Sequence, residues 1–364
     1  MINKLVFENL RHRPVRTLLS TVAIGVQVTM MLTLVGLCRG MLQDQARRSR
    51  GIGADIFVRA PDASFLSLSA GFTQSFIPFL QKQPHVAMAT GALMHSTGFL
   101  STVTGLDLPA FEKMSGPIRF LSGGPYEKPN EAIVDEYYAR QHKLRVGDSI
   151  TMLNRHWRVS GIFEQGKSAR LIIPLDVLQD LIGLRGKVMV IYVKLDNPAH
   201  TQQVIDYLKA HGMADYQIHS MEELLSQYTV QNVPMLPEFI GVVIGLGVVV
   251  GFLVVFLSMY TAVLERTREI GVLKALGASP VFVLNVLLRE TTLLAILGSA
   301  LGILFTYGTR WLIVTFAPGG LLQAIVPDWW PIAAGIALVG ALLGAAWPGL
   351  KAARQDAIEA LSYE

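Results

Sequence analysis

Residues 239–264 read FIGVVIGLGVVVGFLVVFLSMYTAVL, a run of 26 residues without a charged side chain. A helix needs about 20 apolar residues to cross the hydrocarbon core of a bilayer, so this stretch predicts a transmembrane helix. Comparable apolar stretches occur at 17–38, at 281–316, whose uncharged centre is 291–309, and at 329–350. The sequence therefore predicts four transmembrane α-helices.

The charged residues are concentrated in one part of the chain. Only 16% of all residues are charged and the mean hydropathy is +0.43, whereas a soluble domain carries about 25% charged residues. Residues 39–238, between the first and second predicted helices, hold 39 of the 58 charged side chains. We therefore expect a membrane protein with one large extracytoplasmic domain between helices 1 and 2. The composition excludes a disordered or collagen-like chain.

The short segments outside the predicted helices indicate the orientation, because lysine and arginine in short loops mark the cytoplasmic side. Basic residues occur in 1–16, in 265–290 and in the tail 351–364, whereas the 317–328 loop has none. We therefore expect both termini and 265–290 on the cytoplasmic side, with 39–238 and the short 317–328 loop outside.

The first 16 residues contain an apolar stripe beside positive charges. This pattern predicts an amphipathic helix on the cytoplasmic membrane surface, and a few frayed residues before the first transmembrane helix are the alternative. The stripe consists of Ile2, Leu5, Val6 and Leu10.

Residues 39–238 predict a mixed α/β (α+β) fold. Turn signals separate β-rich stretches from two helical ones. We expect strands at 54–59, 149–153, 157–163, 170–173 and 188–195, and helices at 130–145 and 198–211. The single cysteine, Cys38, excludes an internal disulfide framework. The eight histidines have no metal-ligand spacing and no nucleophile–base arrangement is recognisable, so neither a metal site nor a catalytic residue is predicted.

One stretch has the letters of a nucleotide-binding loop. It matches G-x-x-x-x-G-K-[ST] through Gly161, Gly166, Lys167 and Ser168, and that motif holds phosphates between a strand and a helix. Here the strand-like residues 170–173 follow in place of a helix, and ATP is scarce outside the cell. We therefore predict no nucleotide site here; a membrane-tethered ATPase is the alternative that these letters leave open.

The segment 265–280 reads ERTREIGVLKALGASP. Its apolar residues recur at helical spacing between polar ones: Ile270, Leu273 and Leu276 beside Arg266, Glu269 and Lys274. We expect a short amphipathic helix under the membrane that serves as a docking surface for a cytoplasmic partner, with a solvated linker as the alternative.

The same segment carries signals for where its helix ends. Gly277 is a typical residue just past a helix end, Ser279 is a typical N-cap, and Pro280 fits the first turn of the next helix. The sequence therefore predicts a tight turn into the third transmembrane helix.

Arg268–Ala278 resembles the coupling segment of the MacB/FtsX family of ABC transporter permeases, with its R-E-I-G-x-L-x-A-L-G-A pattern. Other parts of the chain resemble further motifs of that family. Asn9–Arg11 and Arg16–Leu19 resemble its N-terminus, and Val146–Ile150 and Val159–Phe163 its periplasmic core domain. Glu290–Gly302 resembles its third transmembrane helix, and Pro348–Arg354 with Ile358–Leu361 its C-terminal signature. The resemblance covers nearly the whole chain, and the coupling and C-terminal motifs are its most specific parts.

The resemblance implies a mechanism known as mechanotransmission, in type VII ABC transporters. Two permease chains, identical or different, pair above two cytoplasmic ABC ATPase subunits, and ATP-driven motion reaches the outer domains, which export or extract a substrate. On this basis the chain is a permease-only subunit in the cytoplasmic (inner) membrane of a bacterium. It is not itself an enzyme and binds no cofactor, since ATP is bound by a separate ATPase. Membrane lipid and, in some relatives, a periplasmic adaptor or lipoprotein are further partners, and no nucleic acid is expected.

The resemblance also places the contact with the ATPase in the 265–280 segment. The residues carried over are Glu265, Arg266, Arg268, Glu269, Ile270, Gly271, Leu273, Lys274, Leu276 and Gly277. Glu290 is a separate candidate, because an acid at the edge of a transmembrane helix is costly unless it is paired. Its neighbour Arg289 points to another side of the helix. A structural role, anchoring the coupling segment, is therefore the favoured interpretation, and a functional role is the alternative.

A second function belongs to another class. An FtsX-like signalling permease uses the same motion to activate an external partner, such as a peptidoglycan hydrolase, and transports nothing. Such permeases generally have a smaller outer domain than the 200 residues of 39–238, which favours export.

Overall fold

The computed structural model divides into two compact units, which we call the membrane unit and the outer unit. The membrane unit contains 1–39, 234–313 and 323–364, and the outer unit contains 40–233 and 314–322. The structure describes residues 8, 14–61, 71–98, 101–316 and 321–355. Nearly all of the predicted amphipathic helix at 1–16, part of the 317–328 loop and most of the tail 351–364 therefore lie outside the described residues.

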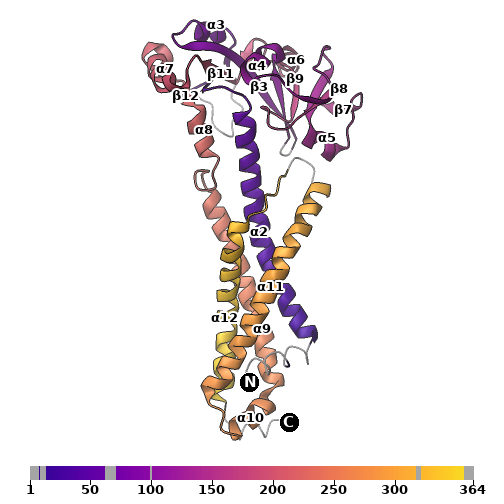
Figure 1. Ribbon diagram of the computed structural model, residues 1–364, viewed down its shortest axis with the longest axis vertical. Coiled ribbons are helices and arrows are strands. Elements are labelled where there is room, and N and C mark those ends of the chain that lie inside the picture. Colours follow the sequence, from indigo (N-terminus) through magenta and orange to yellow (C-terminus); the bar gives the residue numbers. More distant parts are fainter. Residues whose placement is uncertain (1–7, 9–13, 62–70, 99–100, 317–320, 356–364) are drawn as a thin grey trace. The chain divides into compact units, whose positions relative to one another are not determined.

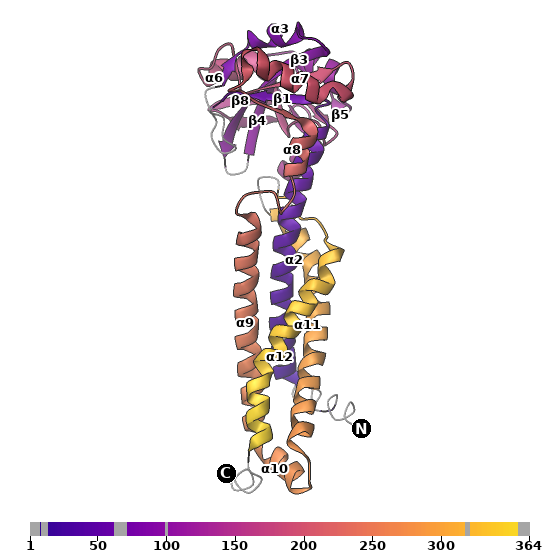
Figure 2. The ribbon, with the colours of Figure 1, turned by 90° about the vertical axis from the view of Figure 1, so that its left-hand side faces the viewer.

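The membrane unit is built from long apolar helices that run side by side in both views (Figures 1 and 2). Within the described residues, four helices are long and apolar enough to cross a membrane, which confirms the predicted fold class. They are α2 (Pro14–Arg50), α9 (Leu236–Glu265), α11 (Pro280–Phe316) and α12 (Trp330–Arg354), the last preceded by the short helix η3 (Pro327–Trp329). The helix α2 continues well beyond residue 38, and its last turns belong to the outer unit.

Glycines allow these helices to approach closely. A Cβ atom on Gly302 of α11 would lie 2.6 Å from the carbonyl oxygen of Gly25 in α2, and a Cβ on Gly344 of α12 would lie 2.7 Å from the carbonyl oxygen of Phe252 in α9. In a membrane, helix association depends on such close packing and on interhelical hydrogen bonds. The pairs α2–α11 and α9–α12 are therefore held at backbone contact.

The outer unit is built on a mixed sheet. Its strand order is β12-β1-β11-β3-β4-β9-β6-β8-β5, with β7 paired to β8. The pairs β4–β9 and β6–β8 are parallel and the others antiparallel. The strands are β1 (Ile56–Arg59), β3 (Val86–Gly98), β4 (Ser101–Leu106), β5 (Phe120–Gly123), β6 (Glu131–Asp135), β7 (Ser149–Met152), β8 (Arg155–Phe163), β9 (Leu171–Pro174), β11 (Val190–Leu195) and β12 (Gln217–Ser220); β2 (Phe72–Thr73) and β10 (Lys187–Val188) form a separate pair.

Short helices cover both faces of this sheet. Successive side chains of a strand point to opposite faces, so Ile56 and Val58 belong to one hydrophobic core and Phe57 to the other. The first core includes residues of α3 (Phe76–Gln81), α5 (Glu136–His142), α6 (Leu175–Leu181) and α7 (Thr201–Leu208), which follows η1 (Pro198–His200) and leads into η2 (Lys209–Met213). The second core includes residues of α4 (Leu108–Ser115) and α8 (Met221–Gln227).

The prediction of a helix at 130–145 is wrong for the first residues of that range. Residues 131–135 form the buried strand β6, and α5 starts only at Glu136. The Asp135 carboxylate accepts a 2.7 Å hydrogen bond from the Tyr138 amide and so caps this helix. A short apolar run of this kind has no period that separates a buried strand from a helix.

The last turns of α2 are fixed in the outer unit. The Asp44 carboxylate forms ion pairs with the guanidinium groups of Arg170, at 2.7 Å, and Arg48, at 3.2 Å. The loop between β8 and β9 then closes over the helix end, because the Ser168 amide donates to the Arg48 carbonyl at 3.2 Å. Gly51, one residue past the helix, lies so near that a Cβ there would be 1.7 Å from the Gly166 carbonyl oxygen.

This contact predicts that Gly51→Ala destabilises the outer unit. The added methyl group has no space unless the 166–168 loop moves, and overpacking of this kind costs about 1–3 kcal/mol. Thermal unfolding of the full chain in detergent measures the loss. Gly124→Ala is the matched control, because no atom lies within 4 Å of the added Cβ there. Equal unfolding midpoints for the two variants would contradict the close contact.

The pH dependence of stability provides a second test. Asp135 is buried, and this burial raises the pKa of its carboxyl group to about 6 although the Tyr138 amide and Arg170 act in the opposite direction. The folded state then binds more protons than the unfolded state, so this group adds stability as the pH falls through about 6. Asp135→Asn keeps an oxygen for the helix cap and removes the titration. We expect the wild type to gain more in unfolding midpoint between about pH 7.5 and about pH 5.5 than this variant does; identical gains would argue against the raised pKa.

Candidate functional site

Within the 265–280 segment, residues Thr267–Ala275 form the helix α10. The helix α9 ends because Arg266 leaves the helical conformation, with φ −110 and ψ 12. The Thr267 hydroxyl then donates to the carbonyls of Val263 at 3.1 Å and Leu264 at 3.0 Å. These bonds satisfy carbonyls that a helix end otherwise leaves without a partner, so the chain turns at a defined residue.

The turn from α10 into α11 has the hydrogen bonds of a Schellman motif. Gly277 has a φ of 92, its amide donates to the Lys274 carbonyl, and the Ala278 amide donates to the Leu273 carbonyl, both at 3.0 Å. The Ser279 hydroxyl accepts from the Phe282 amide at 3.2 Å, directly before α11 begins. The predicted helix stop and the predicted N-cap are thus confirmed, and the turn has one fixed geometry.

One face of α10 is held against three other helices. Ile270 is 6% exposed and belongs to an apolar cluster with residues of α9, α11 and α12, namely Val263, Val283, Leu287 and Ala352. Lys274 extends to the C-terminal end of α12, where its ammonium donates to the carbonyls of Ala353, at 2.9 Å, and Gln355. A cation there interacts favourably with the helix dipole. The inward face of α10 is therefore fixed by both apolar and polar contacts.

The opposite face of α10 is exposed and partly apolar. Leu276 is 81% exposed and Val272 is 44% exposed, with the charged side chains of Arg268 and Glu269 also exposed on this face. The single apolar face expected from the sequence is therefore divided, since Ile270 points inward and Leu276 outward. Exposed apolar residues rimmed by charges are typical of an interaction surface.

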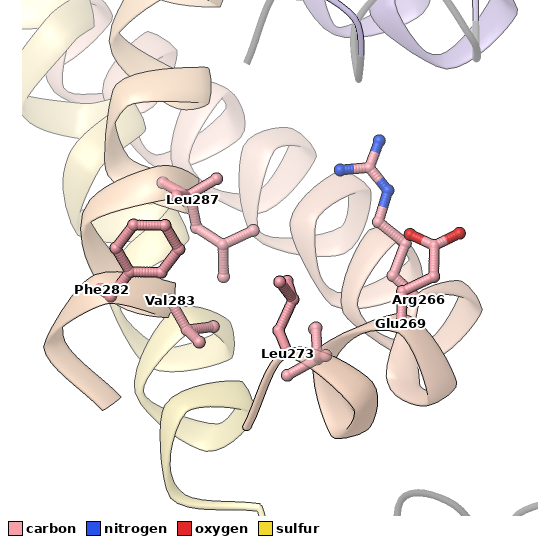
Figure 3. Close-up of a pocket in the computed structure, with 8 residues that line it drawn as sticks. Arg266, Glu269, Leu273, Phe282, Val283 and Leu287 are labelled. Carbon is pink, nitrogen blue, oxygen red and sulfur yellow. The ribbon is translucent and has the colours of Figure 1, made fainter. Parts of the chain in front are cut away.

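A cavity of about 140 Å³ lies between α10 and the start of α11 (Figure 3). Apolar side chains of both helices form most of its wall, and two charged residues of the α10 side complete it. The lining residues are Arg266, Glu269, Ile270, Leu273, Phe282, Val283, Val286 and Leu287. Glu269 both lines the cavity and lies on the exposed face of α10, so the exposed side chains and the cavity are adjacent.

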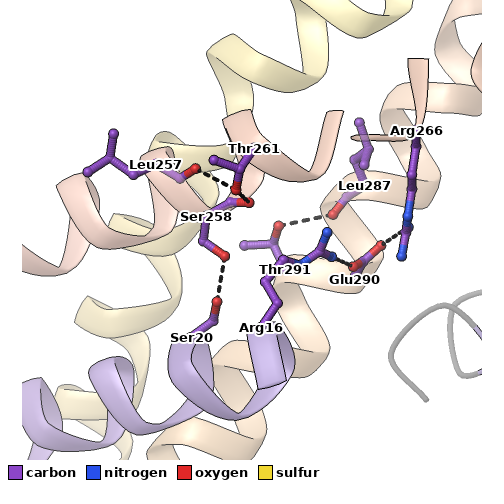
Figure 4. Close-up of polar contacts among 9 residues, drawn as sticks. All are labelled: Arg16, Ser20, Leu257, Ser258, Thr261, Arg266, Leu287, Glu290 and Thr291. Atoms are coloured by element: carbon purple, nitrogen blue, oxygen red, sulfur yellow. Dashed lines mark hydrogen bonds and ion pairs between the residues drawn. The ribbon is translucent and has the colours of Figure 1, made fainter. Parts of the chain in front are cut away.

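Glu290 joins three chain segments through one carboxylate (Figure 4). Its side chain is fully buried, and its two oxygens have different partners: Oε1 lies 2.5 Å from Nη2 of Arg16 in α2, and Oε2 lies 3.2 Å from Nη1 of Arg266. Both guanidinium groups are largely buried as well, at 15% and 8% exposed. A buried charge that loses its partner is strongly destabilising, so this ion triad holds α2, α11 and the α9–α10 break together.

The structure separates the predicted coupling residues into two groups. Glu265, Arg268, Glu269, Leu276 and Gly277 are exposed, whereas Arg266, Ile270 and Gly271 are buried and Leu273 and Lys274 are partly buried. The polar groups of Arg266 and Lys274 therefore bind the protein itself. Their assignment to an ATPase contact stays a prediction, as does the anchoring role of Glu290.

Two residues of the site were not predicted. Arg16 was interpreted only as part of a basic N-terminal cluster, and no local pattern connects it to a residue 274 positions away. Val272 occupies the variable position of the R-E-I-G-x-L pattern; its spacing of four residues from Leu276 is the signal that could have identified it.

The stretch Gly161–Ser168, which has the letters of a nucleotide-binding loop, contacts the C-terminal end of α2. Gly161 lies in β8, and Gly166–Ser168 lie in the loop before β9, so a strand and not a helix follows them. The Lys167 ammonium donates to the Ser115 carbonyl, and Ser168 donates to the end of α2. That no nucleotide binds here stays a prediction.

Two family models match this chain. One is described as FtsX-like permease C-terminal and matches residues 241–357, and the other is described as MacB-like periplasmic core domain and matches residues 17–211. The second model alone covers more than half of the chain. Together they include the coupling segment, most of each of the four transmembrane helices and all strands of the outer-unit sheet except β12.

Curated relatives agree with these models. The uncharacterized ABC transporter permease YknZ of Bacillus subtilis (strain 168) is 34% identical over 42% of this chain and 38% of its own length. The macrolide export ATP-binding/permease proteins MacB of Sodalis glossinidius and Escherichia coli (strain K12) are 24% and 28% identical over 97% and 96% of this chain, and over 59% and 58% of their own lengths. The chain thus spans less than two thirds of each relative. The crystal structure of the periplasmic region of MacB from Actinobacillus actinomycetemcomitans matches 49% of this chain at 17% identity, with a TM-score of 0.39.

The ion triad predicts a large effect for Glu290→Gln. The substitution leaves two buried guanidinium groups without their carboxylate, and breaking a buried ion pair costs roughly 3–5 kcal/mol. Thermal unfolding of the full chain in detergent measures the loss. Arg289→Gln is the matched control, because the adjacent residue is exposed and donates to Asn285 on its own helix at 3.1 Å. Destabilisation no larger than that of the control would show that the triad contributes little.

Proposed function

This chain belongs to the MacB/FtsX-like family of ABC transporter permeases, and from that premise we propose that it couples ATP hydrolysis to work on the outer side of the membrane. In the proposed complex a separate ABC ATPase docks on α10, and two permease chains transmit its motion to their outer units. The substrate is exported or extracted at the outer face by mechanotransmission. The chain itself is a non-catalytic subunit of this complex.

The observation that carries this proposal is the two-sided character of α10. A helix that only linked α9 to α11 would gain nothing from exposing Leu276 and Val272 to water. Here these side chains stand on a helix whose other face is bound to three neighbours. A partner that pushes on this face therefore moves α10 together with the helices packed against it, as it would not if α10 were a flexible loop.

The route of transmission follows from the contacts of α2. Its first turn carries Arg16, which binds Glu290, and its last turns carry Asp44 and Arg48, which are bound in the outer unit. One uninterrupted helix of 37 residues contains both ends. We infer that displacement of α10 reaches α2 through Glu290 and continues along this helix.

The ATP-hydrolysing part is proposed to be a separate ABC ATPase, with this chain as the permease. The MacB relatives are named ATP-binding/permease proteins, and the two family models match this chain as an FtsX-like permease segment and a MacB-like periplasmic core domain. The orientation follows from the same assignment: α10 and both termini face the cytoplasm, where the ATPase and ATP are found, and the outer unit faces the opposite side.

The alternative function, signalling without transport, uses the same contacts below the membrane. The family model that matches 241–357 bears the FtsX name, whereas the one that matches 17–211 bears the MacB name and favours export. Crosslinking of the full chain in cells distinguishes the two functions. Recovery of a peptidoglycan hydrolase supports signalling, and recovery of a lipoprotein, an adaptor or a hydrophobic compound supports export.

The docking role of α10 predicts that Leu276→Asp uncouples the complex. The aspartate places a charge in the apolar centre of the proposed contact, and central contacts of an interface carry most of its binding energy. We expect the permease-stimulated ATP hydrolysis of the purified complex to fall by roughly tenfold or more. Because the Leu276 side chain is 81% exposed, the fold should not change.

The control for this experiment makes the same chemical change in the outer unit. Leu121 lies on the edge strand β5 and is 52% exposed, so Leu121→Asp should leave both ATPase stimulation and stability close to wild type. Full stimulation by the Leu276→Asp protein would rule out α10 as the docking surface.

A further inference from the structure

The outer unit brings two histidines and an aspartate together at one end of its sheet. The Nδ1 atom of His85 lies 3.0 Å from Oδ2 of Asp196, and the Nδ1 atom of His200 lies 3.2 Å from Oδ1 of the same carboxylate. The two imidazole rings are neighbours, with centroids 3.9 Å apart. One potential ligand atom from each residue lies within 4.8 Å of the other two.

The sheet register produces this arrangement. His85 directly precedes β3 and Asp196 directly follows β11, and these strands are paired with Leu195 opposite Val86. The Asp196 amide donates to the His85 carbonyl at 3.0 Å, which fixes the two residues side by side. His200 follows one helical turn after Asp196, at the end of η1. Residues 111 positions apart thus meet at one corner of the unit.

The backbone of His85 is in an unfavourable conformation. Its φ is 63, in the left-handed region that non-glycine residues seldom adopt. Such a conformation persists where the surrounding structure enforces it, and outliers of this kind concentrate at functional sites. Here it places the imidazole against the carboxylate.

The residue types match the preferences of a borderline divalent cation. Zinc sites use histidine nitrogen at about 2.0–2.1 Å and carboxylate oxygen at about 2.0–2.2 Å in tetrahedral geometry, so neighbouring ligand atoms lie about 3.4 Å apart. The 3.0 and 3.2 Å separations join the two Nδ1 atoms to different oxygens of Asp196. One ligand atom from each residue lies within 4.8 Å of the other two, so side-chain rotations within this cluster would bring the three to the spacing of a zinc site.

We propose that His85, Asp196 and His200 form a zinc site with three protein ligands and an open fourth position. Each of the three side chains is about one third to one half exposed, at 35%, 52% and 32%, so water or a side chain of a binding partner can complete the coordination. Sites with three protein ligands and an open position are typical of zinc that also contacts another molecule. In this protein the metal would join the β3–β11 end of the sheet to the start of α7.

Titration of the full chain with Zn²⁺ tests this proposal. The protein is purified in detergent without a histidine tag and freed of metal with a chelator, and binding is followed by calorimetry. We expect one Zn²⁺ per chain with an affinity at least tenfold above that of His200→Ala and of Asp196→Asn. His85→Asn is the third variant, because asparagine tolerates the left-handed backbone and lacks the imidazole. Unfolding midpoints measured without metal show whether each variant remains folded.

The control is a histidine–carboxylate pair that lacks a second histidine. His219 contacts Glu223 through Nδ1 at 2.9 Å with the same spacing of four residues, so His219→Ala should bind Zn²⁺ as the wild type does. The proposal is overturned if the wild type binds no Zn²⁺ at micromolar concentration, or if a folded His200→Ala protein binds it equally well. In either case the cluster is a set of hydrogen-bonded surface side chains.

Discussion

The arrangement of the membrane unit depends on the buried carboxylate of Glu290. Arg16 and Arg266 each bind one of its oxygens, and the carboxylate has no exposed surface. Moving such a charge out of water costs several kcal/mol, which only well-placed partners offset. All three segments must therefore be in position at once. This requirement places the first turn of α2, the α9–α10 break and α11 relative to one another more strictly than apolar packing alone does.

The other contacts of α10 add to the position that the ion triad sets for the α9–α10 break. The Schellman turn at Gly277 and the N-cap at Ser279 connect α10 to α11 with little freedom, and Lys274 ties the same helix to the end of α12. Ile270 completes this attachment from the inside. The exposed Leu276 consequently has a fixed position relative to the other helices, as the proposed docking of an ATPase on α10 requires.

The sequence predicted those features that short-range signals determine. Gly277, Ser279 and Pro280 act on their immediate neighbours, and the transmembrane helices depend on the length of apolar runs, so both were predictable. The strand β6 was mistaken for a helix because its apolar part, Ala132–Val134, is too short to show a period and the strand acquires its conformation from β8 and β9 on either side. The contacts of Glu290 with Arg16, and of His85 with Asp196, join distant residues, and a single sequence carries no signal for such pairs.

The ion triad also limits the type of motion that coupling can use. If α10 separated from α2 during the proposed ATPase cycle, Glu290 would keep only one of its two arginine partners and the other arginine would lose its carboxylate. Breaking a buried ion pair costs roughly 3–5 kcal/mol. Motion that keeps the triad intact avoids this cost, because α2, α10 and α11 then move as one body. At the other end of α2, Arg170 and the 166–168 loop hold Asp44 and Arg48 in the same way. For the proposed coupling, the contacts therefore favour rigid-body transmission along α2 over a mechanism in which the triad opens and closes as a switch.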